Sequence, residues 1–248
     1  MRLFFISLLV ILSGKTGKVV NINNDHRAQK GFAVIELFTS EGCSSCPPAD
    51  EAVAEIQHSY ADGVYVLSFH VDYWNYLGWK DEFSDAQFSA RQQRYASVFH
   101  LESIYTPQVI INGKKEFVGS DKTQLEKTID ESLKTAGNND IQLNSSVTAG
   151  QHINVQYETN ADDRYLLNVA LVQLKAESDV KRGENRGRKL KHVNVVRALQ
   201  EVSLKNNGKA SVQFDMPAGL NKNDCKIVAY LQDKHSLVIT GVKEVAIQ

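Results

Sequence analysis

The sequence predicts an α/β domain over residues 30–137, followed by an all-β, sandwich-like domain over residues 140–248. In the first part, continuous apolar runs alternate with stretches whose apolar residues recur at helical spacing, a pattern typical of alternating strands and helices. In the second part, short alternating runs are separated by Gly, Asn and Asp turns. The stretch GNND at residues 137–140 separates the two patterns.

Residues 1–17, ahead of the first domain, have the features of a secretory signal peptide. Arg2 precedes the apolar run LFFISLLVIL at residues 3–12, and the small, polar stretch SGKTG follows it. The apolar run is too short to span a membrane, which takes about 20 residues. We therefore expect an exported protein, periplasmic or extracellular, without stable insertion in a membrane.

The overall charge argues against a nucleic-acid partner. The 28 Lys and Arg residues nearly balance the 29 Asp and Glu residues, so the formal net charge is −1. A protein with this balance has no global attraction to a polyanion. Three cysteines in 248 residues are also too few for a fold built on disulfides.

The first domain is predicted to follow the order strand, helix, strand, helix, strand, strand, helix. GFAVIELFTS (31–40) is almost continuously apolar, like a strand buried on both faces. The stretch ADEAVAEIQHSYADG (49–63) has a helical stripe, and the preceding Pro47 and Pro48 suit the first turn of a helix. The remaining elements are a strand in GVYVLSFHVD (63–72), a helix over 84–99, two short strands in YTPQVIINGKKEFVG (105–119) and a helix from about 121 that ends at 137.

The second domain is predicted to contain about seven short strands, which is typical of a β-sandwich. Their sequences are IQLNSSVT, HINVQYE, YLLNVALVQLKA, HVNVVRALQEVSL, ASVQFDM, CKIVAYLQD and LVITGVKEVAI.

Cys43 and Cys46, in TSEGCSSCPPAD (39–50), are the main candidates for chemistry. The spacing alone fits a redox pair, half of a metal site or a structural staple. At the start of a helix, however, free N–H groups and the helix dipole stabilise a thiolate. We expect Cys43 to be the exposed attacking thiol and Cys46 the resolving thiol.

Glu36 and Glu41 are candidates for the proton acceptor near Cys46. Glu36 has the stronger rationale because it interrupts a buried strand. A carboxylate that faces an edge or loop is an equally good interpretation of Glu36.

Four stretches, ELFTSEGCSSCPPAD, HVDYWNYLGWKD, YTPQVIING and GENRGRKLKHVNVVR, together resemble a family of secreted thioredoxin-like proteins from bacteria and plants that has no assigned function. The resemblance covers nearly all of the chain after the signal peptide. It implies a thioredoxin fold for residues 30–137, with a cis Thr106–Pro107 bond that lies against the two cysteines. It also implies that the Thr106 backbone pairs with an extended substrate.

Two further groups of residues are candidates for substrate binding. Asp72 and Trp74 follow the second predicted strand, at the sheet edge where α/β proteins bind ligands, although aromatic residues there also pack loops. Arg186 and Arg188 lie in a basic stretch that either forms a solvated hairpin tip or binds an anionic group near the cysteines.

The sequence thus favours a thiol–disulfide oxidoreductase that needs no cofactor and acts on a protein or small-molecule thiol or disulfide. Two alternatives remain open. One is a binding module with an inert Cys43–Cys46 disulfide, and the other is a copper-handling module that uses both thiolates with His70 or His100. No metal site is assigned, because a closed zinc site lacks its third and fourth ligands and Cys225 is expected to be a buried core residue.

Overall fold

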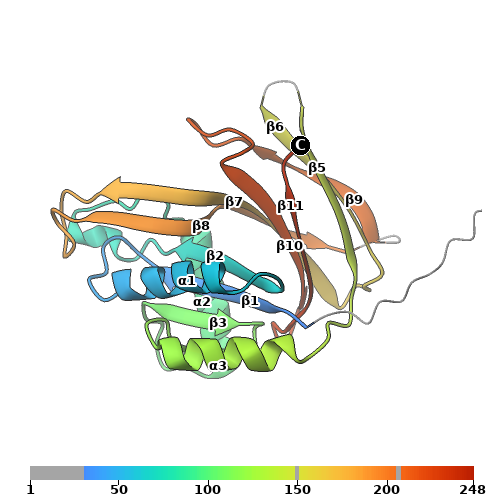
Figure 1. Ribbon diagram of the computed structural model, residues 1–248, viewed down its shortest axis with the longest axis horizontal. Coiled ribbons are helices and arrows are strands. Elements are labelled where there is room, and N and C mark those ends of the chain that lie inside the picture. The colour runs from blue at the N-terminus through green and yellow to red at the C-terminus, as the bar shows by residue number, and fades with distance from the viewer. Residues whose placement is uncertain (1–30, 149–150, 205–207) are drawn as a thin grey trace, which may run out of the picture.

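The computed structural model describes residues 31–148, 151–204 and 208–248 (Figure 1). The predicted signal peptide lies outside these residues. Each strand and helix expected in the first and second parts of the chain has a counterpart in the structure. In chain order the elements are β1 (Ala33–Thr39), α1 (Pro47–Ser59), β2 (Val64–His70), the 3-10 helix η1 (Asn75–Leu77), α2 (Ala86–Phe99), β3 (Gln108–Ile111), β4 (Lys115–Val118), α3 (Lys122–Leu133), β5 (Ile141–Thr148), β6 (His152–Thr159), β7 (Tyr165–Asp179), β8 (Lys189–Ser203), β9 (Lys209–Asp215), β10 (Cys225–Asp233) and β11 (Ile239–Ala246).

One eight-stranded sheet runs through both parts of the chain, in the order β11-β10-β7-β8-β2-β1-β3-β4. β1 and β2 pair in parallel, as a strand–helix–strand unit requires, whereas β3 is antiparallel to β1. The strands of the second part pair antiparallel with one another. The sheet is therefore mixed.

The two parts of the chain meet where β8 lies beside β2. Ser68 of β2 pairs with Val195, and the Ser68 hydroxyl donates to the carbonyl oxygen of Val193 at 2.8 Å. An unpaired strand edge exposes backbone N–H and C=O groups, and β8 covers this edge of β2 beside Ser68. The boundary at residues 137–140 thus separates two sequence patterns but not two sheets.

Helices cover both faces of the first four strands. Ile35 and Leu37 of β1 share a core with residues of α1 and α3. Val34 and Phe38 point to the opposite face, where they pack with Tyr95 of α2. Because successive strand residues point to opposite faces, β1 is buried on both.

A second, three-stranded sheet of β5, β6 and β9 packs against β7 and β10. Leu167 and Leu171 of β7 face this sheet, whereas Ala170 and Val172 face the core around α2. Strands β5 to β11 therefore form two packed sheets, one of which continues into the first part of the chain (Figure 1).

The two ends of the large sheet approach each other around the core that contains α2. The backbone N–H of Ile239, at the start of β11, donates to the Asn112 carbonyl oxygen at 2.9 Å, in the turn between β3 and β4. Gly113 follows with φ +63°, and a Cβ added to it would lie 1.9 Å from the carbonyl oxygen of Leu237. The close approach of the two turns therefore requires glycine at position 113.

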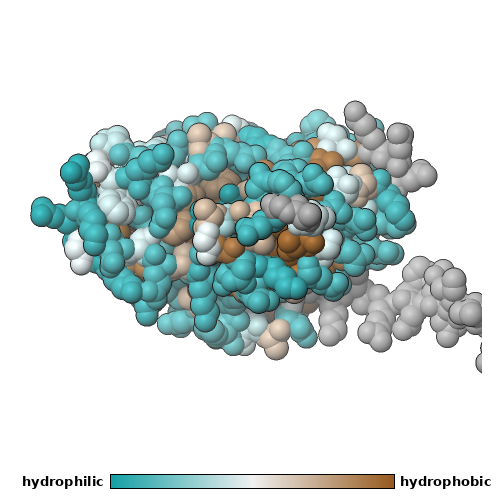
Figure 2. All heavy atoms as spheres, turned by 90° about the horizontal axis from the view of Figure 1, so that it is seen from above, coloured by the Kyte–Doolittle hydropathy of each residue, from teal (hydrophilic) through white to brown (hydrophobic). Residues whose placement is uncertain are grey.

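Hydrophilic residues predominate on the face shown in Figure 2. Among the described residues, the exposed large hydrophobic side chains are Tyr76, Val118 and Val147. None of the helices in the described ranges is long and apolar enough to cross a membrane.

Candidate functional site

Cys43 and Cys46 form a disulfide at the start of α1, with their Cα atoms 5.4 Å apart. Cys46 is the N-cap residue, and Pro47 and Pro48 form the first turn, as predicted. The Cys46 N–H donates to the Cys43 carbonyl oxygen at 3.3 Å, which closes a tight turn between the two cysteines.

Both cysteines are fully buried, each with 0% of its surface exposed. This corrects the expectation of an exposed Cys43. The loop between β7 and β8, residues 180–188, lies against the C-x-x-C turn, and Figure 1 shows the end of this hairpin near the start of α1. A segment distant in the sequence therefore helps to bury the disulfide, and no local pattern around Cys43 indicates it.

Asn185 makes the closest contacts between this loop and the C-x-x-C turn. Its amide nitrogen donates to the carbonyl oxygens of Glu41, at 2.9 Å, and Cys43, at 2.8 Å, and its side chain is fully buried. The neighbouring Glu184 carboxylate accepts a hydrogen bond from the Ser44 N–H at 3.1 Å. This hydrogen bond lowers the pKa of Glu184.

The basic side chains of the loop, in contrast, lie in its exposed part. Arg186 and Arg188 are both exposed and line a shallow hollow beside Asp179. Arg188 donates to the Asn185 side-chain oxygen at 3.0 Å, so it orients the residue that touches the C-x-x-C turn. The structure thus brings an acid and an amide to the cysteines, where the sequence suggested two arginines.

Thr106 and Trp74 do lie beside the C-x-x-C turn. The Thr106–Pro107 bond is cis, and the Thr106 carbonyl oxygen accepts a hydrogen bond from the Ser45 hydroxyl at 3.5 Å. The Trp74 indole donates to the Thr106 hydroxyl at 2.8 Å. Gly42 allows this packing, since a Cβ added there would lie 2.9 Å from the Trp74 Cβ. Two segments that the sequence singled out separately thus form one wall of the site.

Asp72 is engaged in holding α2. Its carboxylate accepts a hydrogen bond from the Ser89 hydroxyl at 2.5 Å, and its N–H donates to the same hydroxyl at 3.1 Å. Asp72 therefore fixes the chain after β2 to the first turn of α2.

Glu36 has a different role from the predicted proton acceptor. Its side chain leaves β1 on the face that α2 covers, whereas Leu37 and α1 lie on the other face. Arg91 binds its carboxylate at 2.7 Å, Tyr230 donates to it at 3.0 Å, and Tyr95 also donates to it. This fully buried network joins β1, α2 and β10 in the core.

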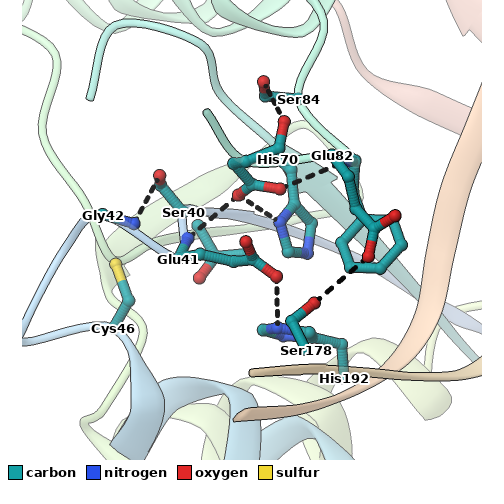
Figure 3. A network of polar contacts seen from close by, with 12 residues as sticks. Ser40, Glu41, Gly42, Cys46, His70, Glu82, Ser84, Ser178 and His192 are labelled. Carbon is teal, nitrogen blue, oxygen red and sulfur yellow. Dashed lines mark hydrogen bonds and ion pairs between the residues drawn. The ribbon is translucent and has the colours of Figure 1, made fainter. Parts of the chain in front are cut away.

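Glu41, Asp50 and His192, which we call the carboxylate–histidine cluster, lie buried behind the disulfide. Figure 3 shows the Glu41 carboxylate pointing towards His192, with Cys46 at the start of the adjacent helix. Nε2 of His192 is 3.7 Å from the Glu41 carboxylate, and Nδ1 is 3.5 Å from the Asp50 carboxylate. All three residues are at most 5% exposed.

Each carboxylate of the cluster also accepts a hydrogen bond from a residue outside the cluster. The Trp79 indole donates to Glu41 at 2.6 Å, and the Thr39 hydroxyl donates to Asp50 at 3.2 Å. The other oxygen of each carboxylate faces His192, and among the described residues it has no closer polar partner than the imidazole nitrogens at 3.5 and 3.7 Å. The imidazole of His192 is therefore buried between the two carboxylates.

Charge on the two carboxylates controls the state of His192. Burial lowers the pKa of His192, but Asp50 and Glu41 outweigh this effect and raise the pKa to about 10. The imidazole is therefore protonated at neutral pH and lies between two carboxylates.

A second pair of a histidine and a carboxylate, His70 and Asp81, lies next to the carboxylate–histidine cluster. Nδ1 of His70 is 2.7 Å from the Asp81 carboxylate, and the His70 and His192 rings are 4.7 Å apart. Burial raises the pKa of Asp81, but His70 and the N–H groups of Glu41 and Phe83 outweigh it, so the pKa is lowered. His70 is thus a core histidine with a carboxylate partner.

Asp50 connects the cluster to the disulfide. Its N–H donates to the Cys46 carbonyl oxygen at 3.1 Å, one helical turn into α1. Residues four apart lie on the same helix face, and side chains lean towards the N-terminus, so the Asp50 carboxylate lies on the Cys46 side of the helix. This spacing was visible in the sequence and could have identified Asp50. His192 and Asn185 could not be placed from local patterns.

The described part of the chain contains no preformed group of side chains that could bind copper. His100 caps the C-terminus of α2 and is exposed, away from the pair formed by His70 and Asp81. Across residues 31–148, 151–204 and 208–248, no three His, Cys, Asp or Glu side chains are arranged to hold a metal ion.

Comparisons with other proteins give a family but no activity. Residues 34–232 match the model of a family described as "Protein of unknown function (DUF1223)". No curated protein matches the sequence. The chain is similar to a protein from Agrobacterium tumefaciens whose crystal structure is known, with 29% sequence identity and a TM-score of 0.66. The match covers 88% of this chain and 96% of that protein's chain. A domain of the outer membrane lipoprotein Omp28 from Porphyromonas gingivalis is 14% identical over 45% of this chain and 89% of its own, with a TM-score of 0.30, too low to support an argument.

Proposed function

The chain belongs to this family of unknown function, and we propose from its site that it is an exported thiol–disulfide oxidoreductase that uses Cys43 and Cys46 without a cofactor. The observation that carries the proposal is a C-x-x-C disulfide at the start of a helix, with the buried carboxylate–histidine cluster beside it and Asp50 one helical turn from Cys46. A protein or small-molecule thiol or disulfide would be the substrate.

The arrangement around the disulfide supports a thioredoxin-like architecture for residues 30–137. The element order is β1-α1-β2-α2-β3-β4-α3, and the disulfide follows the first strand. The Thr106–Pro107 segment lies beside the C-x-x-C turn through the Ser45 contact.

In the reductive direction, a Cys43 thiolate attacks a substrate disulfide and displaces one substrate sulfur as a thiolate. Cys46 then loses its proton and attacks the Cys43 sulfur, which re-forms the protein disulfide and releases the second substrate sulfur. Two electrons pass to the substrate, and two protons end on its thiols. A thiol reductant then returns the protein to the dithiol state.

The carboxylate–histidine cluster would serve the proton step at Cys46. The Asp50 carboxylate, one helical turn from Cys46, would accept the Cys46 proton, and protonated His192 would compensate negative charge beside it. When the disulfide is reduced, Asp50 returns the proton. Asp50 thus takes the place that the sequence suggested for Glu36, and Glu41, the other candidate from the sequence, belongs to the same cluster.

The reduction of insulin disulfides by dithiothreitol tests this function. Cys43→Ala is expected to abolish the catalysed rate, and Cys225→Ala, a buried cysteine of β10, to leave it intact. Cys46→Ser is expected to trap a mixed disulfide on Cys43 that mass spectrometry can identify. Absence of catalysis in the wild type would refute the proposal.

Complete burial of both cysteines favours a second candidate, a binding module with an inert disulfide. Equilibration with glutathione buffers separates the two functions. Structural disulfides have reduction potentials below about −300 mV, whereas oxidoreductases lie at about −270 to −120 mV. A potential in the lower range, with no catalysis, would favour the binding module.

A further inference from the structure

The loop at residues 180–188, which we call the cover loop, is a compact hairpin in its own right. The Val180 N–H donates to the Arg188 carbonyl oxygen at 3.0 Å, and the Gly187 N–H donates to the Val180 carbonyl oxygen at 2.8 Å. Gly183 and Gly187 both have positive φ, which allows these turns. The cover loop is therefore a single hydrogen-bonded unit between the ends of β7 and β8.

Asn185 is the residue that the cover loop presents to the disulfide. It is 0% exposed, whereas Glu184 and Arg186 on either side are exposed. Its two donated hydrogen bonds reach the carbonyl oxygens of Glu41 and Cys43, the residues that flank Gly42 at the start of the C-x-x-C turn. A polar side chain is thus inserted beside Cys43.

The contacts that hold the cover loop on the C-x-x-C turn are few and reversible. Among the described residues, the hydrogen bonds between this loop and the C-x-x-C turn are the two donated by Asn185 and the one from the Ser44 N–H to Glu184. Each of the released groups can bind water when the loop lifts, and a hydrogen bond of this kind contributes modestly to stability. Lifting the loop therefore does not require the core to unfold.

We propose that the cover loop controls access to the Cys43–Cys46 disulfide, so that a reductant or substrate reaches the sulfur atoms only after Asn185 has left the C-x-x-C turn. This regulation rests on the proposed function, but the event it describes is physical access to a disulfide. The fully buried state of both cysteines corresponds to the closed form.

Reduction of the oxidised full-length chain by a neutral phosphine, tris(3-hydroxypropyl)phosphine, tests the proposal. The phosphine attacks one sulfur, releases the other as a thiolate, and water converts the adduct to phosphine oxide and a second thiol. Asn185→Ala is expected to raise the reduction rate at least about five-fold, since it removes two of the three hydrogen bonds described above between the loop and the C-x-x-C turn. The matched control is Arg186→Ala, in the same loop, which is expected to leave the rate unchanged.

Cys225 reports whether a variant has simply unfolded. It is buried in β10, and burial raises the pKa of its thiol to about 11, so iodoacetamide reacts with it slowly in the folded protein. Faster reduction of Asn185→Ala with Cys225 still protected supports the cover loop. An unchanged rate with Cys225 protected overturns it.

A milder variant keeps the test valid if Asn185→Ala does not fold. Glu184→Ala removes only the contact with Ser44, at an exposed side chain, and is expected to raise the rate by a smaller factor. An unchanged rate in this variant would then overturn the proposal. Because reduction is measured on the protein's own disulfide, the cover loop can be confirmed even if the insulin assay shows no catalysis.

Discussion

Replacing His192 with glutamine is expected to lower the free energy of unfolding by about 3–5 kcal/mol at pH 7, because it leaves Glu41 and Asp50 buried without their cation. The magnitude follows from the charge that the site holds. The pKa of His192 is raised from 6.5 to about 10. Each pKa unit is worth about 1.4 kcal/mol, so the folded state favours the protonated imidazole by on the order of 5 kcal/mol.

The raised pKa of His192 also predicts how the free energy of unfolding changes with pH. Between pH 6.5 and about 10, the folded state holds a proton at His192 that the unfolded state has lost. The free energy of unfolding therefore falls as pH rises, by up to about 1.4 kcal/mol per pH unit from this group. The stabilisation is complete below pH 6.5 and is lost as pH passes 10, so the wild type and His192→Gln are expected to converge there.

Urea unfolding followed by tryptophan fluorescence measures both effects. His152→Gln is the matched control, because Nδ1 of His152 lies 2.6 Å from Asp215 in an ion pair that is largely exposed. This control is expected to leave the free energy of unfolding unchanged within error. A His192→Gln variant within about 1 kcal/mol of the wild type would refute a charged His192 between the two carboxylates.

Two further predictions concern stability, each measured by urea unfolding. Arg91→Ala is expected to lower the free energy of unfolding by about 3–5 kcal/mol, because Glu36 is left buried without its cation; a loss as small as that of a surface substitution would contradict the assigned network. Gly113→Ala is expected to destabilise the protein more than Gly187→Ala. Both glycines have positive φ, but only at Gly113 would the added Cβ meet backbone, 1.9 Å from the Leu237 carbonyl oxygen. Equal losses of stability would show that the β3–β4 turn can move.

The sequence predicted the individual elements well because strands and helices are encoded by local periodicity. The apolar run of β1, the two prolines of α1 and the glycine turns of the second part each act within a few residues. The pairing of β2 with β8 instead joins residues far apart in the chain, such as Ser68 with Val193 and Val195. No local pattern specifies it, so the sheet that joins both parts was not predicted.

The candidate site was predicted only where its residues lie in local motifs, and not where they come together from distant parts of the chain. Cys43 and Cys46 lie in a motif, and Thr106 precedes the proline that the resemblance singled out. His192 alternates within a strand like any inward-facing residue, and its role appears only when β8 lies against α1. In the GENRGR stretch, the sequence pointed to Arg186 and Arg188 because of their charge. The residue that makes the buried contact with Cys43 is the uncharged Asn185.

The contact between the β3–β4 turn and the start of β11 bears on the order in which the chain acquires its structure. During synthesis, Asn112 leaves the ribosome long before Ile239, its hydrogen-bond partner. Until β10 and β11 arrive, the core around α2 lacks Tyr230, and Glu36 lacks one of its donors. Contacts between distant segments must overcome the entropy of loop closure before packing compensates for it. The chain is therefore expected to complete this core in one late step, and a fragment that ends at residue 140 is expected not to reach the native state.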